Sequence, residues 1–209
     1  MSEESWVEVR DEPRHRQRFE NDFARVYDVR IPPGDTTLYH RHTEDTFYVS
    51  ILPARVRNQT WGESEAQTND VPQGIAICAP HRDQPLTHQV SNVGEGKMRM
   101  IGAEVRRSPD RTADAPLEAP GHSLHWERPR LRAYLLELEP GQSTGEVTYG
   151  FSGLSVALAD GNLDLQGADG AASLIACSPG DLVWHDGPAR FELTNRGGES
   201  FRAYVAEWR

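Results

Sequence analysis

Apolar side chains recur at every second position in several short segments of the chain. Tyr27, Val29 and Ile31, for example, would lie on one face of an extended segment, with the charged residues between them on the other. This period of two is typical of a β-strand with one buried face. The same kind of pattern predicts further strands at residues 47–51, 98–101, 154–158 and 201–205.

Turn-forming residues separate these segments at short intervals, as Pro32-Pro33-Gly34 does directly after the first strand. Helical periodicity is scarce, and only residues 13–24 have a pattern compatible with a short helix. Short strands with regular turns predict an all-β protein built as a barrel or a sandwich. We expect two apolar stripes, Phe47/Val49/Ile51 and Met98/Met100, to line its interior.

A set of landmark residues occurs twice along the chain. At an offset of 107, Arg25, Tyr27 and Gly34 have the counterparts Arg132, Tyr134 and Gly141. At an offset of 103, Pro85, Asn92 and Arg99 have the counterparts Pro188, Asn195 and Arg202. Two constant offsets that differ by one small change in length indicate a duplicated unit. Each unit is about 100 residues long, enough for a small domain with its own core.

The histidines are not duplicated in the same way. In the first half His40, His42 and His88 fall at landmark positions. The residues at the corresponding positions of the second half are Val147, Tyr149 and Phe191. We therefore expect a functional site in the first half and a dry, packed core in the second, where Phe191 lies opposite Val147.

Three histidines in this arrangement suit a metal ion. Residues at i and i+2 of a strand point to the same face, so His40 and His42 can converge on one ion. A third imidazole from His88 completes a facial arrangement and leaves positions open for water, dioxygen or substrate. Imidazole suits Fe, Zn, Cu, Ni and Mn. The sequence therefore predicts one divalent metal site.

Two sequence motifs resemble those of the cupin superfamily. Gly34 followed by His40, His42, an acid and the strand 47–49 is similar to the first cupin motif, and Pro85-x-x-His88-x-x-x-Asn92 is similar to the second. The duplicated chain thus resembles a bicupin, which implies two jelly-roll-type β-barrels in tandem. By position, the resemblance implies the metal ligands His40, His42, Asp45 and His88.

The acidic position departs from the cupin pattern. Asp45 replaces the usual glutamate and follows His42 one residue sooner, so its shorter side chain leaves a three-histidine site as the alternative. Glu44 is a neighbouring substitute. For a general base, Tyr39, Tyr48, Glu44 and Asp45 all remain candidates, although strand parity turns Tyr48 away from the face of Phe47.

The resemblance and the repeat together predict a domain organisation. Residues 1–21 form an N-terminal extension, 22–105 a metal-binding barrel, 106–129 a Pro-rich linker and 130–209 a degenerate barrel without a metal site. Other histidines receive structural interpretations: His15, between two arginines, is expected to be solvated, and His185 to lie in a turn.

The resemblance implies a metal-dependent enzyme acting on a small organic molecule. A weak or absent carboxylate ligand is similar to the three-histidine iron dioxygenases among cupins, which oxidise thiols or diketones. A dioxygenase-like oxidoreductase with Fe(II) is therefore the first expectation, with Zn, Ni, Mn or Cu as other metals. The alternatives are a cupin isomerase or lyase, or a non-catalytic protein that binds or senses a small molecule through the metal.

Charge narrows the range of partners. The chain has 22 Lys and Arg against 32 Asp and Glu, a formal net charge of −10. Nucleic acids and anionic membranes both attract basic surfaces, so we expect neither as a partner. The acidic start of the chain lacks the pattern of a signal peptide, which predicts a cytoplasmic protein. A small-molecule substrate is expected, and a homodimer is possible by analogy with other cupins.

Overall fold

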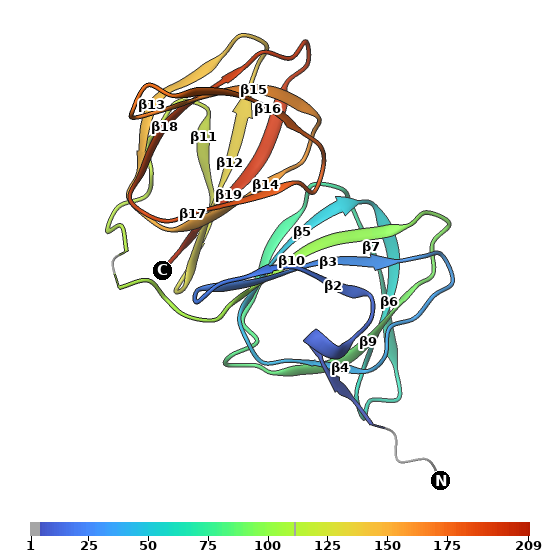
Figure 1. Cartoon of the computed structure of the whole chain (residues 1–209). Coiled ribbons are helices and arrows are strands. Elements are labelled where there is room, and N and C mark those ends of the chain that lie inside the picture. The colour runs from blue at the N-terminus through green and yellow to red at the C-terminus, as the bar shows by residue number, and fades with distance from the viewer. Residues whose placement is uncertain (1–4, 111) are drawn as a thin grey trace. The chain divides into compact units, whose positions relative to one another are not determined.

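Both halves of the chain fold as β-structure. The computed structural model describes residues 5–110 and 112–209, which divide into two compact units between Arg107 and Ser108. In each unit the strands wrap around an interior (Figure 1). Within the described residues the single helical element is η1 (Val9–Asp11), one turn of 3-10 helix. The prediction of an all-β protein with two barrel-like units is confirmed.

The first unit contains two five-stranded sheets. One sheet has the order β1 (Val7–Glu8), β4 (His40–His42), β9 (Leu86–Asn92), β6 (Ala54–Thr60) and β7 (Ala66–Val71). The other has the order β2 (His15–Glu20), β3 (Ala24–Ile31), β10 (Met98–Val105), β5 (Thr46–Leu52) and β8 (Ala76–Ala79). Apolar side chains from both sheets, such as Tyr27 and Val90, form one buried cluster between them.

The second unit repeats this plan with nine strands. Its five-stranded sheet has the order β11 (His122–Arg128), β12 (Leu131–Leu138), β19 (Phe201–Trp208), β14 (Gly153–Ala157) and β17 (Leu182–His185). Its four-stranded sheet has the order β13 (Ser143–Tyr149), β18 (Ala189–Asn195), β15 (Gly161–Gly167) and β16 (Ala172–Cys177). Residues of both sheets again share one core cluster.

A buried asparagine closes the same turn in both units. Asn92 Nδ2 donates to the carbonyl oxygens of Ile31 at 2.9 Å and Gly96 at 2.8 Å. Asn195 Nδ2 makes the equivalent pair of bonds in the second unit, both at 2.8 Å. Because an unpaired buried amide is costly, these bonds hold the two strands that flank each turn. The shared asparagines therefore serve the fold.

The N-terminal segment belongs to the first barrel. Of the extension predicted over residues 1–21, residues 1–4 lie outside the described residues. In the rest, β1 pairs with β4 and β2 pairs with β3, where His15 lies opposite Val29. The helix predicted over 13–24 is also wrong. As a strand, β2 turns its arginines outward and His15 inward, and β3 supplies the backbone partners that a free segment would lack.

The predicted linker over 106–129 is likewise shorter than expected. Strand β11 pairs with β12 and so forms part of the second barrel. The segment before it is also fixed to that unit, because Arg132 donates to the carbonyl oxygens of Ala113 at 3.0 Å and Asp114 at 2.9 Å. Its few apolar residues gave no strand pattern in the sequence.

Strand β5 faces the interior with the opposite set of residues from the one expected. Met98 and Met100 line the interior cavity as predicted, and so does Tyr48. Phe47 and Val49 are fully buried on the other face of the sheet. Alternate residues of a strand point to opposite faces, so Tyr48 lines the interior and its neighbours Phe47 and Val49 do not. The prediction for Phe47 and Val49 was therefore wrong.

Candidate metal centre

Three of the predicted ligands come together inside the first barrel. Strand β4 carries His40 and His42 on one face, and its pairing with β9 places His88 directly opposite His40. The ring centroids of His88 lie 4.7 Å from His40 and 5.1 Å from His42. This geometry follows from the i, i+2 spacing and the strand register that bring the two motifs together.

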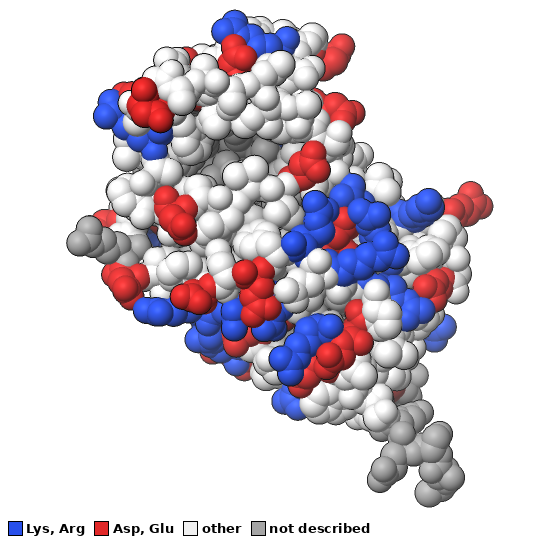
Figure 2. Space-filling model, in the orientation of Figure 1, with Lys and Arg blue, Asp and Glu red and all other residues white. Residues whose placement is uncertain are grey.

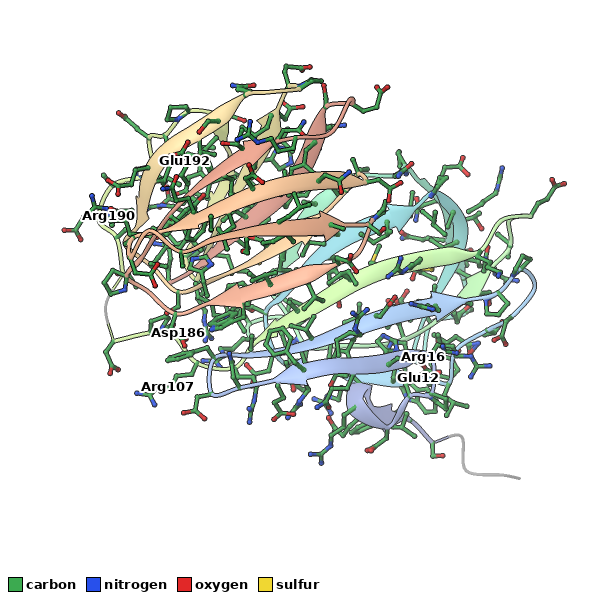
Figure 3. All side chains as sticks on the ribbon, turned by 45° about the horizontal axis from the view of Figure 1, so that its top comes forward. Glu12, Arg16, Arg107, Asp186, Arg190 and Glu192 are labelled. Atoms are coloured by element: carbon green, nitrogen blue, oxygen red, sulfur yellow. The ribbon has the colours of Figure 1, made fainter. Side chains whose placement is uncertain are left out.

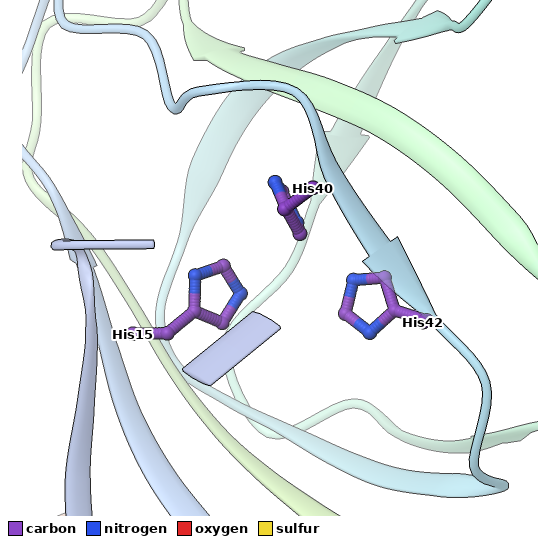
Figure 4. A group of neighbouring side chains, drawn as sticks. All are labelled: His15, His40 and His42. Carbon is purple, nitrogen blue, oxygen red and sulfur yellow. The ribbon is translucent and has the colours of Figure 1, made fainter. Parts of the chain in front are cut away.

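A fourth imidazole, from His15 on β2, completes the cluster. Its ring centroid lies 4.6 Å from that of His40 and 6.0 Å from that of His42. One ligand atom from each of His15, His40 and His42 falls within 4.8 Å of the others, and the three rings face a common space in Figure 4. His15 is 9% exposed, so the expectation that it is solvated was wrong.

Hydrogen bonds orient three of these rings through their Nδ1 atoms. His15 Nδ1 lies 2.8 Å from Glu12 Oε2, His40 Nδ1 lies 2.8 Å from the Leu38 carbonyl oxygen, and His42 Nδ1 lies 3.2 Å from the Tyr48 hydroxyl. A ring that donates from Nδ1 presents the lone pair of Nε2. This arrangement is the usual support for metal-ligating histidines.

The remaining Nε2 atoms fit a cation. His40 Nε2 is buried without a hydrogen-bond partner among the described residues. His42 Nε2 and His88 Nε2 are 3.2 Å apart, a contact that needs a proton or cation because two lone pairs repel. Two nitrogens that each lie about 2.1 Å from one ion are about 3 Å apart in a facial or tetrahedral set. The donor set therefore suits a divalent metal ion.

Burial holds the three imidazoles of His40, His42 and His88 in the neutral form, which is the form that binds metal. Burial lowers the pKa of His40 to about 4, with a further contribution from His15. Burial lowers the pKa of His42 well below the ordinary value, helped by the neighbouring His88. The pKa of His88 is depressed for the same reasons, burial first and then His40.

Glu12 is the carboxylate that supports this cluster. Its side chain is fully buried and accepts hydrogen bonds from His15 and from the backbone N–H groups of Arg14 at 2.7 Å and Leu38 at 3.2 Å. Burial alone would raise its pKa, but the bond and charge of His15 and the backbone donors lower the pKa to about 2. In Figure 3 it lies next to the short helix η1. Glu12 therefore remains ionised.

The two acidic residues considered as ligands lie elsewhere. Asp45 Oδ1 accepts the backbone N–H of Arg82 at 3.0 Å, and Glu44 Oε2 pairs with the Arg82 guanidinium at 2.7 Å. Neither residue lines the cavity that holds the histidines. The short side chain of Asp45 and its early position after His42 both contribute to this. The structure thus brings His40, His42 and His88 together without Asp45.

The cavity beside the histidines has a volume of about 370 Å³ and is mainly apolar. Its walls include Val29, Ile31, Ile75, Ile77, Leu86, Met98 and Met100. Asn58 and Asp70 are among the polar residues of the wall, and no Lys or Arg side chain belongs to the described lining. A pocket of this size and character suits a small organic molecule with an apolar body.

Tyr48 and His81 form a polar pair at the edge of the cluster. The Tyr48 hydroxyl lies 3.4 Å from His81 Nε2 as well as 3.2 Å from His42 Nδ1. The His81 ring stacks on that of His42 with centroids 4.8 Å apart. Burial raises the pKa of Tyr48, so the hydroxyl stays protonated. The parity argument against Tyr48 was therefore wrong, and Tyr48 is a proton donor or acceptor within the pocket.

The repeat extends to His15, which the motifs alone do not identify. His122 follows His15 at the same offset of 107 that relates the other landmarks, and both lie on the first strand of their five-stranded sheets. Position 119, the counterpart of Glu12, is alanine.

The second unit has other side chains at the equivalent positions. Val147 pairs with Phe191 in the strand register, as predicted, and both pack in the core cluster. The Tyr149 hydroxyl lies 2.8 Å from His122 Nε2. Within the described residues, the group of possible metal ligands is confined to the first unit.

Comparison with known proteins identifies the fold. No protein-family model and no curated protein matches the sequence. The structure is similar to AerE from Microcystis aeruginosa, with a TM-score of 0.61 and 10% identity over 95% of this chain and 98% of that one.

Two further structures support the same conclusion. Salicylate 1,2-dioxygenase from Pseudaminobacter salicylatoxidans has a TM-score of 0.61 and 13% identity over 89% of this chain and 71% of that one. A variant of oxalate decarboxylase OxdC from Bacillus subtilis also has a TM-score of 0.61 and 13% identity, over 96% and 76%. The chain therefore has the cupin fold, with one barrel in each unit. None of its described helices is long and apolar enough to cross a membrane.

Proposed function

We propose that the first barrel is a metal-dependent enzyme that transforms a small, largely apolar organic molecule. The observation that carries this proposal is the convergence of His15, His40, His42 and His88 at one side of an apolar cavity of about 370 Å³. Imidazole ligands bind a metal in their uncharged form, so a set of histidines leaves the charge of a divalent ion uncompensated by a direct carboxylate ligand. The preferred substrate thus combines an apolar body with an ionisable oxygen or sulfur.

A dioxygenase-like oxidoreductase with Fe(II) is the first choice of reaction. When bound, such an ion supplies redox chemistry and the polarisation of a coordinated oxygen or sulfur. The chain itself orients the imidazoles, through Glu12 and the Leu38 carbonyl, and excludes water with the apolar walls. The similar structures include both a dioxygenase and a decarboxylase, so the type of reaction has to be argued from the residues.

A lyase or isomerase is the second candidate because of Tyr48 and His81. Their contact at 3.4 Å places a protonated hydroxyl and an imidazole of lowered pKa on the cavity wall. Burial is the main cause of that lower pKa. Such a pair can hold or move a proton during the conversion of a bound carbonyl compound. A non-catalytic sensor would use the same pocket without turnover.

Metal analysis and oxygen consumption test the proposal. The protein purified from cells should contain close to one equivalent of a divalent metal, and His40→Ala/His42→Ala should lose it. Arg82→Gln is the matched control, because Arg82 pairs with Glu44 outside the cavity. Oxygen uptake with Fe(II) and a panel of apolar thiols and diketones would support the oxidoreductase. Metal retained by the double variant would refute the site.

A further inference from the structure

The second barrel encloses a cavity of its own, with a volume of about 300 Å³. Its walls are almost entirely apolar and include Leu136, Leu163, Leu165, Ile175, Phe191 and Val205. Figure 2 shows a hollow on this unit, bordered mainly by residues other than Lys, Arg, Asp and Glu. The second barrel therefore contains both the packed core predicted from Val147 and Phe191 and an open cavity.

The repeat explains where this volume comes from. Phe191 and Val147 replace two histidines, but Ser155 stands at the position of Tyr48, and Ala203 stands at the position of Met100. Both smaller residues line the cavity. A barrel with a purely structural role gains stability when such a volume is filled, because a large apolar void forfeits contacts. Large apolar cavities of this kind bind apolar guests.

One buried polar atom in the cavity wall lacks a partner. His185 Nε2 is buried and makes no hydrogen bond among the described residues, whereas the backbone of Phe151 hydrogen-bonds to the same ring. Since Nε2 is unpartnered, that bond uses Nδ1 as the donor. Burial, the main cause, lowers the pKa of His185 to about 4. The neutral ring thus presents the lone pair of Nε2 as an acceptor.

The position of this ring depends on a glycine. A Cβ atom on Gly153 would lie 2.9 Å from His185 Cε1 and 3.3 Å from Nε2. Aromatic rings of Tyr149 and Phe191 pack around the imidazole, with centroids 5.4 and 6.4 Å away. The ring is therefore held by packing on several sides, which gives its free nitrogen a fixed direction.

Charge at the cavity excludes one class of ligand. Asp181 is the charged residue of the described lining, and it is exposed and accepts the backbone N–H of Ser178 at 2.8 Å. No Lys or Arg side chain belongs to that lining. An anionic ligand would lose its hydration without gaining a cationic partner. An uncharged molecule loses little hydration free energy when it enters the cavity.

We infer that the second barrel is a binding site for a small, uncharged hydrophobic molecule that carries a hydroxyl group. The apolar walls take up its body, and the hydroxyl donates to His185 Nε2. This site is separate from the metal centre in its residues and in its chemistry, because it needs no ion.

Calorimetric titration with three matched naphthalenes tests this inference. 2-Naphthol carries the hydroxyl donor, 2-methoxynaphthalene lacks it, and 2-naphthoate is anionic. The protein is treated with EDTA first, so that no phenol can ligate a metal in the first barrel. We expect 2-naphthol to bind most tightly and 2-naphthoate most weakly. Tightest binding of the anion, or equal binding of all three, would overturn the inference.

Matched variants of the two barrels test which cavity binds 2-naphthol. Ala203→Phe fills the cavity and should weaken the binding of 2-naphthol at least about tenfold, since the apolar contacts are lost. Met100→Phe introduces the same side chain at the equivalent position of the first barrel and should change the affinity less than about twofold. If circular dichroism shows that Ala203→Phe does not fold, Leu165→Trp fills the cavity from the opposite sheet. Binding that survives the filled cavity, or is lost in Met100→Phe, contradicts the assignment.

The hydrogen bond has its own test. His185→Phe keeps a ring in place but removes the acceptor, so 2-naphthol should lose about 2- to 10-fold in affinity. The affinity for 2-methoxynaphthalene should stay the same, because that molecule has no hydroxyl proton to donate. An equal change for both probes would contradict the role of His185 Nε2.

Discussion

Replacing Glu12 by glutamine tests the support of the metal cluster most directly. Both carboxylate oxygens accept hydrogen bonds: Oε2 from His15 and the Arg14 backbone, and Oε1 from the Leu38 backbone and the Arg14 guanidinium. An amide has one accepting oxygen, so in either orientation its NH₂ group faces two donors. Glu12→Gln thus loses the charge that orients His15 and leaves buried donors unpaired.

The size of the effect follows from these contacts. Loss of a carboxylate that orients a ligating histidine typically weakens metal binding about 10- to 100-fold, which corresponds to about 1.4–2.8 kcal/mol. The unpaired donors should also lower the free energy of unfolding of the metal-free protein by about 1–3 kcal/mol. The two effects are separate, because the second is present without any metal.

Competition with a chromophoric chelator, using Zn²⁺ or Co²⁺, measures the metal affinity, and urea unfolding in EDTA measures the stability. Glu104→Gln is the matched control, since Glu104 is a buried carboxylate that pairs with Arg25 at 3.3 Å and is absent from the lining of the metal cavity. His15→Ala should weaken binding at least as much as Glu12→Gln, and the double variant should add little. If Glu12→Gln changes the metal affinity less than about threefold relative to the control, His15 is not an oriented ligand.

Three further variants have defined outcomes. Asp45→Asn should leave the metal affinity within about twofold, measured by the same competition, because its carboxylate accepts a backbone N–H outside the cavity; a tenfold loss would make Asp45 a ligand. Tyr48→Phe removes a hydrogen bond to His42 Nδ1, so its turnover is measured at saturating metal, where kcat should fall about 100-fold if Tyr48 transfers a proton; unchanged turnover would limit Tyr48 to orienting His42 and packing. Burial raises the pKa of Glu104 from 4.5 to about 6. The protonated form therefore stabilises the fold below pH 4.5, and this contribution of about 2 kcal/mol is lost as the pH rises through 6. Urea unfolding at pH 4.5 and 7.5 measures this difference in the free energy of unfolding, and Glu104→Gln should make the difference smaller. If the variant has the same pH dependence as the unmodified protein, the raised pKa of Glu104 is refuted.

The strands and the three motif histidines could be predicted because each depends on local spacing. Alternation defines a strand, and the i, i+2 spacing of His40 and His42 places both rings on one face whatever the rest of the chain does. The register of β4 and β9, which brings in His88, was implied by the cupin resemblance. Predicting these features requires little knowledge of how distant segments pack.

The features that were missed depend on pairing between distant segments. Residues 13–24 are highly charged and compatible with a short helix in isolation, and only pairing with β3 makes residues 15–20 a strand with His15 inside. The parity of β5 depends on which face of the sheet covers the cavity, and alternation alone does not choose between Tyr48 and Phe47. Asp45 is close to the site in sequence, but its short side chain reaches a backbone N–H first.

The two units have a histidine at the same position of the fold, His15 and His122, but the two rings have different hydrogen-bond partners. His122 Nδ1 contacts the carbonyl oxygen of Pro120 at 3.0 Å, and its Nε2 is occupied by the Tyr149 hydroxyl. His15 instead has a buried carboxylate on Nδ1, and its ring contacts the imidazoles of His40 and His42. A carboxylate partner makes an imidazole a stronger ligand than a neutral carbonyl partner does. Glu12 in the first unit, where the second has alanine, is therefore the difference that suits His15 to the proposed metal site and leaves His122 without a carboxylate partner.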